Sequence, residues 1–340
     1  MKIDLLHTGK SPESRLFDVL VALSPVVVWS FVIYGKRAVL IELISVVTAC
    51  VLHVGIQYAL RSFRKIRRPL FDLSPAVTGL LLSLTLPIGV PVYVVIIGSA
   101  SAIIIKEAFG GMGKNPINPA LAGRAVLELF FRKSLVVVPV FNTAMEKSAI
   151  RSLLDNELPD MEILDMFFGR MDAGLGEMSA LLIMIGGLYL IVRRVAKLET
   201  PIVFLASAAV VSMLISPDNV SYFRFTGAEL LGGGIMLSAF FFSADPVTAP
   251  HIPLGRMVFA AVCGALSVLC RIYLGYEGVY IIVLVMGLWT PFADRFMRPA
   301  VFGGNKKLVI TNTPPTGSAK AETPSVGGAG DEEEKKDAVG

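Results

Sequence analysis

Two asparagines lie in the stretch FGGMGKNPINPALAG (109–123), between two long apolar runs. Glycine and proline, the residues that most strongly end a helix, crowd around Asn115 and Asn118. The amide side chains offer donors and acceptors where the backbone loses its own partners. A broken helix in an apolar chain is tolerated only where it is buried in protein or lines a wet cavity. We therefore expect Gly110, Gly111, Asn115 and Asn118 to form a binding site rather than a linker.

A second break, SADPVTAP (243–250), carries Asp245 and Thr248. A carboxylate at membrane depth is costly when it is left unpaired, so it is a functional hypothesis by default. For Asp245 we favour a polar pathway or a cofactor contact. Asp245 and Thr248 are therefore expected to complete the intramembrane site.

Other ionisable residues lie within or beside apolar runs. Glu42 is also interpreted as part of a polar pathway, and Lys106 and Glu107 lead directly into the first break. Asp72 and Glu177 have two equally good explanations. Each carboxylate either caps a helix N-terminus or has a functional role.

The histidines and cysteines form no catalytic or metal-binding pattern. The histidines are far apart in the sequence, and a solvated or hydrogen-bonded side chain explains each. The cysteines have no CxxC spacing; two of them share a helix face, but two thiols alone build no zinc or iron–sulfur site. Walker and dinucleotide-binding motifs are absent. We predict neither a catalytic nor a metal-ligating residue among His7, His53, His251, Cys50, Cys263 and Cys270.

The composition is that of a membrane protein. Hydrophobic residues make up 54% of the 340 residues and charged residues only 17%. One or two soluble cores could not bury that much apolar surface. The net charge of +4 is modest and the Lys and Arg residues gather in short loops, which argues against a nucleic-acid partner.

Ten apolar segments predict an all-α polytopic membrane protein with about ten transmembrane helices. Several segments are shorter than a straight span and are flanked by Gly and Pro, which indicates half-helices or interrupted spans. The segments are 16–33, 38–60, 74–88, 90–107, 117–131, 176–194, 200–215, 229–244, 254–273 and 277–293.

The Lys and Arg residues predict the orientation. Clusters at 61–68, 193–197 and 295–307 all fall on one side if there are ten spans, and that side should be cytoplasmic. The N-terminal residues carry no cleavable signal. Both termini are therefore expected in the cytoplasm.

A weak internal repeat divides the chain. The stretches 80–91 and 238–250 each end an apolar run with two prolines four residues apart. Five spans per half is an odd number, so the second copy is expected to be inverted, and inverted repeats with paired breaks favour a site at their interface. The expected divisions are a cytoplasmic N-terminus (1–15), a first five-helix repeat (16–131), an extracytoplasmic loop (132–175), a second repeat (176–299) and a disordered cytoplasmic tail (300–340).

Four stretches resemble, in order, one family of membrane proteins. They are LFDLSPAVTGLLLSLTLP (70–87), KEAFGGMGKNPINPALAGRAVLELFF (106–131), FGRMDAGLGEMSALLIMIGGLYL (168–190) and LLGGGIMLSAFFFSADPVTAPHIPLGR (230–256). The family unites the D-type membrane component of the Rnf electron-transport complex with the B-type component of the sodium-pumping NADH:quinone reductase. The resemblance covers roughly 11–299, and the short N-terminus favours the Rnf branch.

The resemblance implies a ten-helix subunit of two inverted halves in the bacterial inner membrane, assembled with other Rnf subunits. Such a complex couples electron transfer between ferredoxin and NAD to Na⁺ or H⁺ movement. The resemblance also implies FMN, joined through a phosphoester to a threonine of an S-G-A-T motif in the outward loop. A second, noncovalent flavin (riboflavin) would lie near Asn115 and Asn118.

The outward loop departs from the family pattern. It contains NTAMEKSAI (142–150) in place of S-G-A-T, with Ser148 at the acceptor position and Thr143 out of register. The serine hydroxyl can in principle accept the phosphoryl group, but Glu146 and Lys147 replace small residues and also suit a solvated surface. Covalent FMN at Ser148, a flavin bound without a covalent link and a subunit without flavin are the alternatives.

We interpret the chain as a subunit of an Rnf-type redox-driven ion pump that holds flavin and contributes to the ion or electron path. Two rivals stay open at this stage. Broken half-helices that meet near the midplane also suit a channel or transporter for a small solute. The second rival is a structural subunit that holds the complex together without a cofactor.

Overall fold

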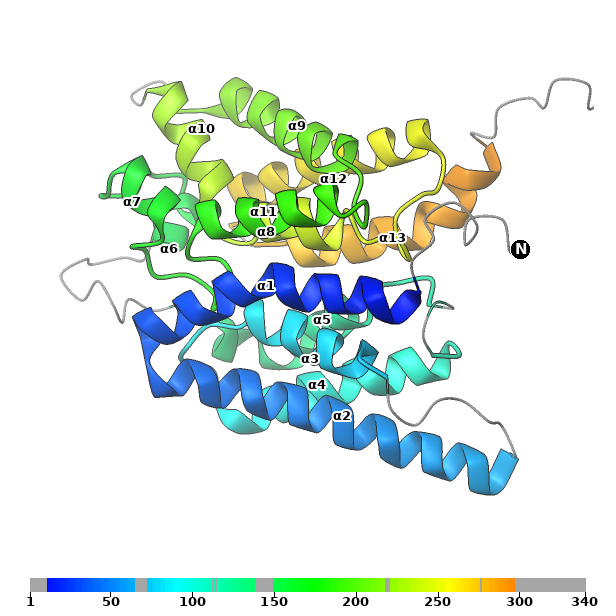
Figure 1. Cartoon of the computed structure of the whole chain (residues 1–340). Coiled ribbons are helices and arrows are strands. Elements are labelled where there is room, and N and C mark those ends of the chain that lie inside the picture. The colour runs from blue at the N-terminus through cyan, green and yellow to red at the C-terminus, as the bar shows by residue number, and fades with distance from the viewer. Residues whose placement is uncertain are drawn as a thin grey trace, which may run out of the picture. The chain divides into compact units, whose positions relative to one another are not determined.

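The computed structural model describes residues 11–64, 72–111, 113, 115–137, 149–217, 221–275 and 277–296. Within these ranges the chain is helical and has no β-strand; one isolated antiparallel bridge joins Pro87 to Gly174. Each of the ten apolar segments coincides with helix (Figure 1). The prediction of an all-α, polytopic membrane protein is confirmed.

The first five segments form helices separated by short connections. These are α1 (Pro12–Tyr34), α2 (Lys36–Arg64), α3 (Ser74–Leu84), α4 (Val92–Ala108) and α5 (Pro119–Phe131), which continues into the 3-10 turn η2 (Arg132–Leu135). The last five segments form α8 (Ala180–Val192), α9 (Glu199–Ile215), α10 (Tyr222–Leu231) with α11 (Ile235–Leu237) and the π-helical turn η3 (Ser238–Phe242), α12 (Pro253–Leu274) and α13 (Val279–Phe296).

Helix length separates full spans from broken ones. Among the described residues, α1, α2, α12 and α13 are long and apolar enough to cross a membrane alone. The helix α10 and the α11–η3 segment form a pair bent by 62° at the glycines 232–234, either a broken span or a re-entrant loop, and α3, α8 and α9 are shorter apolar helices. The segments 74–88, 117–131 and 229–244, predicted as half-helices or interrupted spans, contain α3 with 11 residues, α5 with 13 residues and this bent pair.

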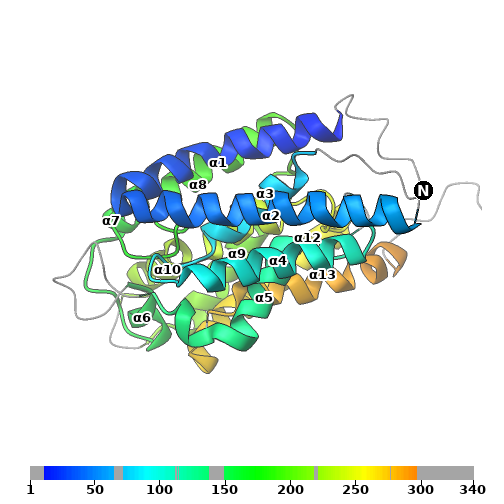
Figure 2. The same ribbon diagram turned by 90° about the horizontal axis from the view of Figure 1, so that it is seen from below.

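The two halves pack their helices in a similar order. In the first half α2 lies against α3 and α4, and α4 lies against α5 (Figure 2). In the second half α9 lies against α10, η3 and α12, and α12 lies against α13. The division into two inverted repeats stays a prediction, but the packing order agrees with it.

The segment expected as an extracytoplasmic loop is partly folded. It contains η2 and two short helices, α6 (Ala149–Leu154) and α7 (Ile163–Phe168). Leu153 and Met166 pack with Phe225 of α10 in a small second core. The mixed charges of this stretch hid its buried apolar positions, and its place outside the membrane stays a prediction.

The C-terminal end of α3 is hydrogen-bonded to the backbone that follows this segment. After α3 ends, the carbonyl of Leu84 accepts a hydrogen bond from Gly176 N (2.7 Å), and the carbonyl of Leu86 accepts one from Leu175 N (2.9 Å). Carbonyl groups at a helix end need such partners when water is excluded. The backbone of 174–176 therefore stabilises the break after α3.

The first helices of the two halves meet directly. The helix α1 packs against α8 and lies between the other helices of the two halves (Figure 1). A Cβ atom on Gly186 of α8 would lie 2.2 Å from the carbonyl oxygen of Ala22, so only glycine permits this approach. Near the other end of α8, Arg193 Nε donates to buried Asp18 (3.0 Å) and Tyr189 donates to the same oxygen (3.2 Å).

The substitution Gly186→Ala is expected to lower the free energy of unfolding by about 1–3 kcal/mol, because the added methyl group must separate α1 from α8. Thermal unfolding of the purified protein in detergent measures the change. The matched control is Gly55→Ala on exposed α2, where a Cβ meets no atom within 4 Å. This control should hold or raise the unfolding temperature, since alanine favours helix. Equal effects of the two substitutions would contradict the close α1–α8 approach.

Candidate functional site

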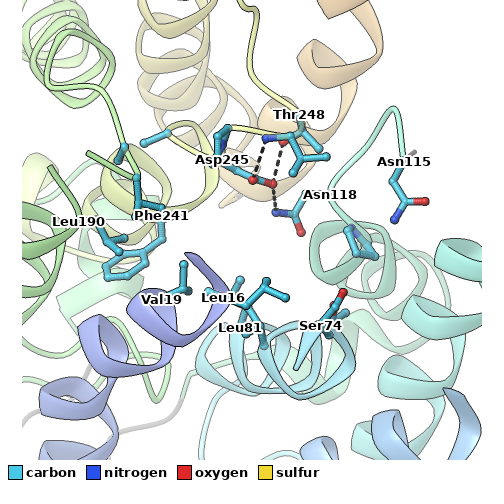
Figure 3. A pocket seen from close by; sticks show the side chains of 18 of the residues that line it. Leu16, Val19, Ser74, Leu81, Asn115, Asn118, Leu190, Phe241, Asp245 and Thr248 are labelled. Atoms are coloured by element: carbon cyan, nitrogen blue, oxygen red, sulfur yellow. Dashed lines mark hydrogen bonds between the residues drawn. The ribbon is translucent and has the colours of Figure 1, made fainter. Parts of the chain in front are cut away.

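The structure brings the two sequence breaks together. Asn118 Nδ2, at the start of α5, donates to Asp245 Oδ2 in the loop after η3 at 3.1 Å (Figure 3). The two residues are separated by 127 positions in the sequence. Their contact joins the first half of the chain to the second inside the bundle.

Local turn chemistry orients Asn118. It is the N-cap of α5, with extended backbone, and its Oδ1 accepts from Ala120 N at 3.0 Å. Pro119 follows at the first helical position, where a missing N–H costs nothing. Because the carbonyl side of the amide is used by the cap, the NH₂ group points at Asp245.

Asp245 is held by three donors. Its Oδ1 accepts from Val247 N at 3.1 Å, and its Oδ2 accepts from the Thr248 hydroxyl at 3.1 Å as well as from Asn118. The backbone carbonyl of Thr248 accepts in turn from the hydroxyl of Thr290 on α13 at 2.9 Å. The turn that the sequence places at 243–250 is therefore anchored to both halves.

A cavity of about 130 Å³, here called the inner cavity, lies beside this contact. In Figure 3 Asp245 and Thr248 face Asn118 on one side, while Ser74 and Leu81 of α3 lie on the other. Its polar lining is Ser74, Thr78, Lys106, Asn115, Asn118, Asp245 and Thr248, and its apolar lining includes Leu16, Val19, Val77, Leu81, Phe240 and Phe241.

The predicted residues contribute unequally to the inner cavity. Asn115 lines it, is 8% exposed, and its Oδ1 has no hydrogen-bond partner among the described residues. Gly110 and Gly111 do not line it; they have φ of 110° and 84° and end α4 in a left-handed turn, with Gly111 N bonded to the Lys106 carbonyl. Their role is to redirect the chain toward Asn115.

The inner cavity has polar lining residues that were not among the predicted site residues. These are Lys106, Ser74 and Thr78, and Gly113 of the first break also lines it. Lys106 was visible in the sequence as a charge entering the first break, whereas Ser74 gave no signal because serine at the start of a helix is ordinary.

The two carboxylates with a proposed capping role differ. Asp72 precedes the N-cap residue Leu73, and its Oδ1 accepts from Ser74 N at 2.8 Å, so it satisfies one N–H group in the first turn of α3. Glu177 does not cap α8, because Ser179 is the N-cap there. The buried Glu177 instead accepts hydrogen bonds from the Tyr280 hydroxyl and from Gly174 N.

A second cavity of about 120 Å³, here called the outer cavity, carries three guanidinium groups. Arg124 is 6% exposed; its Nη2 pairs with Glu128 at 3.2 Å, while Nε and Nη1 have no partner among the described residues. Arg132 and Arg151 line the same space. Unsatisfied buried guanidinium donors are costly, and a phosphate or carboxylate satisfies them.

The loop predicted to carry Ser148 ends beside the outer cavity. Ser148 and Thr143 lie outside the described residues. The helix α6 begins at Ala149, and its Ile150, Arg151 and Leu154 line the outer cavity.

The comparisons with known proteins cover nearly the whole chain. A family model described as the NQR2, RnfD, RnfE family matches residues 5–303. The chain is 32% identical over 309 residues to the D component of the Na(+)-translocating ferredoxin:NAD(+) oxidoreductase complex of Acetobacterium woodii, covering 88% of this chain and 94% of that protein. It is 31% identical over 314 residues to the D component of the proton-translocating ferredoxin:NAD(+) oxidoreductase complex of Clostridium ljungdahlii, covering 88% and 94%.

A third relative has a name that leaves the ion unspecified. The chain is 31% identical over 323 residues to the D component of the ion-translocating oxidoreductase complex of Halorhodospira halophila, covering 84% of this chain and 90% of that protein.

The charge swap Asn118→Asp with Asp245→Asn tests the contact between the two breaks. Asn118→Asp alone keeps the N-cap but sets two carboxylates against each other, so we expect a loss of about 1–3 kcal/mol in the free energy of unfolding. The double substitution restores a donor opposite an acceptor and should recover part of that loss. Thermal unfolding in lipid nanodiscs provides the measurement.

Asn115→Asp is the control for this swap, because it adds the same charge to the same cavity, and no hydrogen bond joins Asn115 to Asp245 in the structure. Adding Asp245→Asn to Asn115→Asp should give no comparable recovery. A swap that is no more stable than Asn118→Asp would refute the contact.

Proposed function

Because the chain belongs to the NQR2, RnfD, RnfE family, we propose that it acts as the D-type membrane subunit of an Rnf-type ion-translocating oxidoreductase complex. Relatives that it matches over nine-tenths or more of their length are named for the movement of Na⁺, of protons or of an unspecified ion. The other subunits of such a complex are its partners, and ferredoxin and NAD⁺ are the electron carriers that two of these names contain. We place the chain in the bacterial inner membrane with both termini in the cytoplasm, as the Lys and Arg clusters favour.

The observation that carries this proposal is the Asn118–Asp245 contact on the inner cavity. It joins two helix breaks from opposite halves of the chain, inside a bundle whose outer surface is apolar. Paired breaks with polar groups near the interface of two repeats are the arrangement in which membrane transport proteins bind their ions or substrates. We therefore assign the inner cavity to the ion path.

The inner cavity suits an ion with its waters better than a whole flavin. Its amides, hydroxyl and carboxylate match the polar edge of a flavin, and its apolar wall matches the ring. The volume of about 130 Å³ is, however, below the roughly 300–1,000 Å³ of pockets that hold cofactors. A noncovalent flavin at Asn115 and Asn118 therefore needs a wider cavity than this structure has.

The outer cavity fits the phosphate group of FMN. Arg124 offers two buried N–H groups without partners, and Arg132 and Arg151 add positive charge. A phosphoester at Ser148 would place that phosphate one residue before α6, which lines the same cavity. Bound FMN would supply one- and two-electron redox chemistry. The chain would supply positive charge mainly from Arg124, which Glu128 orients, because Arg151 pairs with Asp155 at 3.2 Å and the carboxylate of Glu277 also lines the cavity.

Covalent flavin is tested by fluorescence of the denatured protein. After co-expression with the other subunits of the complex and a flavin transferase, the wild-type band in a denaturing gel should fluoresce. Ser148→Ala should abolish this fluorescence, because it removes the acceptor hydroxyl. Thr143→Ala removes a hydroxyl from the same loop and should leave the fluorescence unchanged.

Other outcomes of the flavin experiment decide between the rival functions. A dark band with no flavin released by acid would exclude the flavin and favour a structural subunit of the same complex. Fluorescence that survives Ser148→Ala but is lost in Thr143→Ala would show that the flavin is attached to Thr143 instead. Uptake of a small neutral solute by the isolated chain in liposomes would favour a channel.

A further inference from the structure

The buried guanidinium group of Arg124 is only partly satisfied by the protein. Its Nη2 pairs with Glu128 at 3.2 Å, whereas Nε and Nη1 have no hydrogen-bond partner among the described residues. Buried donors without partners cost free energy, and the planar fork of N–H groups on a guanidinium matches the oxygens of a phosphate or a carboxylate. Because Arg124 lines the outer cavity, it has donors available to an anion that enters this cavity.

Two neighbours hold this guanidinium in place. Glu128 lies one turn later on α5, and the Cζ atom of Arg124 lies 5.6 Å from the centre of the Tyr280 ring on α13. Tyr280 is itself buried, and its hydroxyl donates to buried Glu177. A cation over an aromatic ring is attracted to it, most strongly where water is excluded. The donors of Arg124 are therefore oriented before a ligand binds, which lowers the entropy cost of binding.

The carboxylate on another wall of the outer cavity is engaged elsewhere. Glu277 lines the cavity, but its Oε1 accepts from Gly234 N at 2.8 Å and pairs with Arg271 Nη2 at 3.2 Å. Arg271 is buried, so it holds this carboxylate at the bend after α10. Each of the two carboxylates among the described lining residues thus has an arginine partner, while two nitrogens of Arg124 have none.

Exposed apolar side chains adjoin the outer cavity on two helices. Each is at least 70% exposed and lies within two positions of a lining residue; they are Leu129 and Phe130 on α5, and Tyr273 and Leu274 on α12. In a membrane protein such side chains contact lipid, and tyrosine is enriched at the level of the lipid headgroups. The surroundings of the cavity therefore suit a ligand that has an anionic group and an apolar body.

The size of the outer cavity limits the part of a ligand that it encloses. Its volume of about 120 Å³ is below the roughly 300–1,000 Å³ of pockets that enclose most of a ligand. A phosphate group suits this space, whereas a ring system or acyl chains would lie outside it. A phospholipid divides in this way, with its phosphate beside Arg124 and its chains along the exposed side chains of α5 and α12.

We propose that the outer cavity binds the phosphate group of an anionic phospholipid, with Arg124 as the main donor. The binding is noncovalent, so no bond to the chain forms or breaks. The inference goes beyond the proposed function, because it requires neither a flavin nor an acceptor hydroxyl at Ser148. The phosphate of FMN has the same chemistry, and the lipid occupies the cavity in chains to which no flavin is attached.

Lipid binding to a flavin-free chain tests the proposal. The full chain with Ser148→Ala is made without a flavin transferase, stripped of lipid in detergent and mixed with phosphatidylglycerol. Native mass spectrometry measures the bound lipid, and thermal unfolding measures its effect on stability. We expect phosphatidylglycerol to remain bound and to raise the unfolding temperature. Diacylglycerol, which has the same chains without the phosphate, should bind about tenfold more weakly or less.

Substitutions at the cavity give opposite expected changes in affinity for phosphatidylglycerol. Arg124→Gln removes the donors and should weaken binding about tenfold. Glu128→Gln removes a negative charge and releases Nη2 of Arg124, so it should strengthen binding. Lys133→Gln is the matched control, because it removes the same charge from exposed η2 and Lys133 does not line the cavity. This control should leave the affinity unchanged.

The two directions keep the test decisive if Arg124→Gln does not fold. Unchanged affinity in a folded Arg124→Gln or Glu128→Gln variant would overturn the proposal. Equal binding of diacylglycerol and phosphatidylglycerol would overturn it in favour of contact with the apolar surface alone. Stabilisation by inorganic phosphate or by free FMN, with none by phosphatidylglycerol, would overturn it in favour of a site for soluble phosphates. These readouts involve neither covalent flavin nor ion movement, so failure here is distinguishable from failure of the proposed function.

Discussion

The structure depends on satisfying polar groups at helix ends that lie inside an apolar layer. A helix that stops there leaves amide and carbonyl groups that water cannot reach. The chain pairs the end of α3 with the backbone of 174–176, and caps the start of α5 with Asn118. At the bend of α10, buried Arg271 donates to the carbonyls of Glu229 and Gly232. The cavities lie beside breaks that are stabilised in this way.

The chemistry of each cavity depends on which polar groups remain free to bind a ligand after the backbone groups at the neighbouring helix break have found hydrogen-bond partners. Asn118 uses one side of its amide for the cap and the other for Asp245, so the inner cavity has a defined polar edge. In the outer cavity Glu128 engages only one nitrogen of Arg124, which leaves two donors for an anion. Coupling of electron transfer to ion movement requires a redox group and an ion path in one assembly. In the function proposed above, the outer cavity holds the redox group and the inner cavity belongs to the ion path.

Local sequence patterns were sufficient to predict the membrane helices, but they could not predict which of these helices contact one another. Runs of apolar residues located ten helical segments but not the short helices α6 and α7, and the Gly and Pro residues around Asn118 and Asp245 located two breaks. Contact between Asn118 and Asp245 could be expected only through the repeat, because no short-range rule links residues 127 positions apart. Ser74 could not be found, since its role arises from packing of α3 against α4. The buried role of Glu177 was also hidden, because Tyr280 approaches it from the far end of the chain.

The short helix α3 has a mechanical consequence. Its 11 residues form a rod about 16 Å long, and a hydrogen-bonded helix does not shorten appreciably under load. One end of this rod is tied to the backbone of 174–176, and the other end carries Ser74 against the ammonium of Lys106. The helix α3 therefore fixes the distance between the backbone of 174–176 and one wall of the inner cavity.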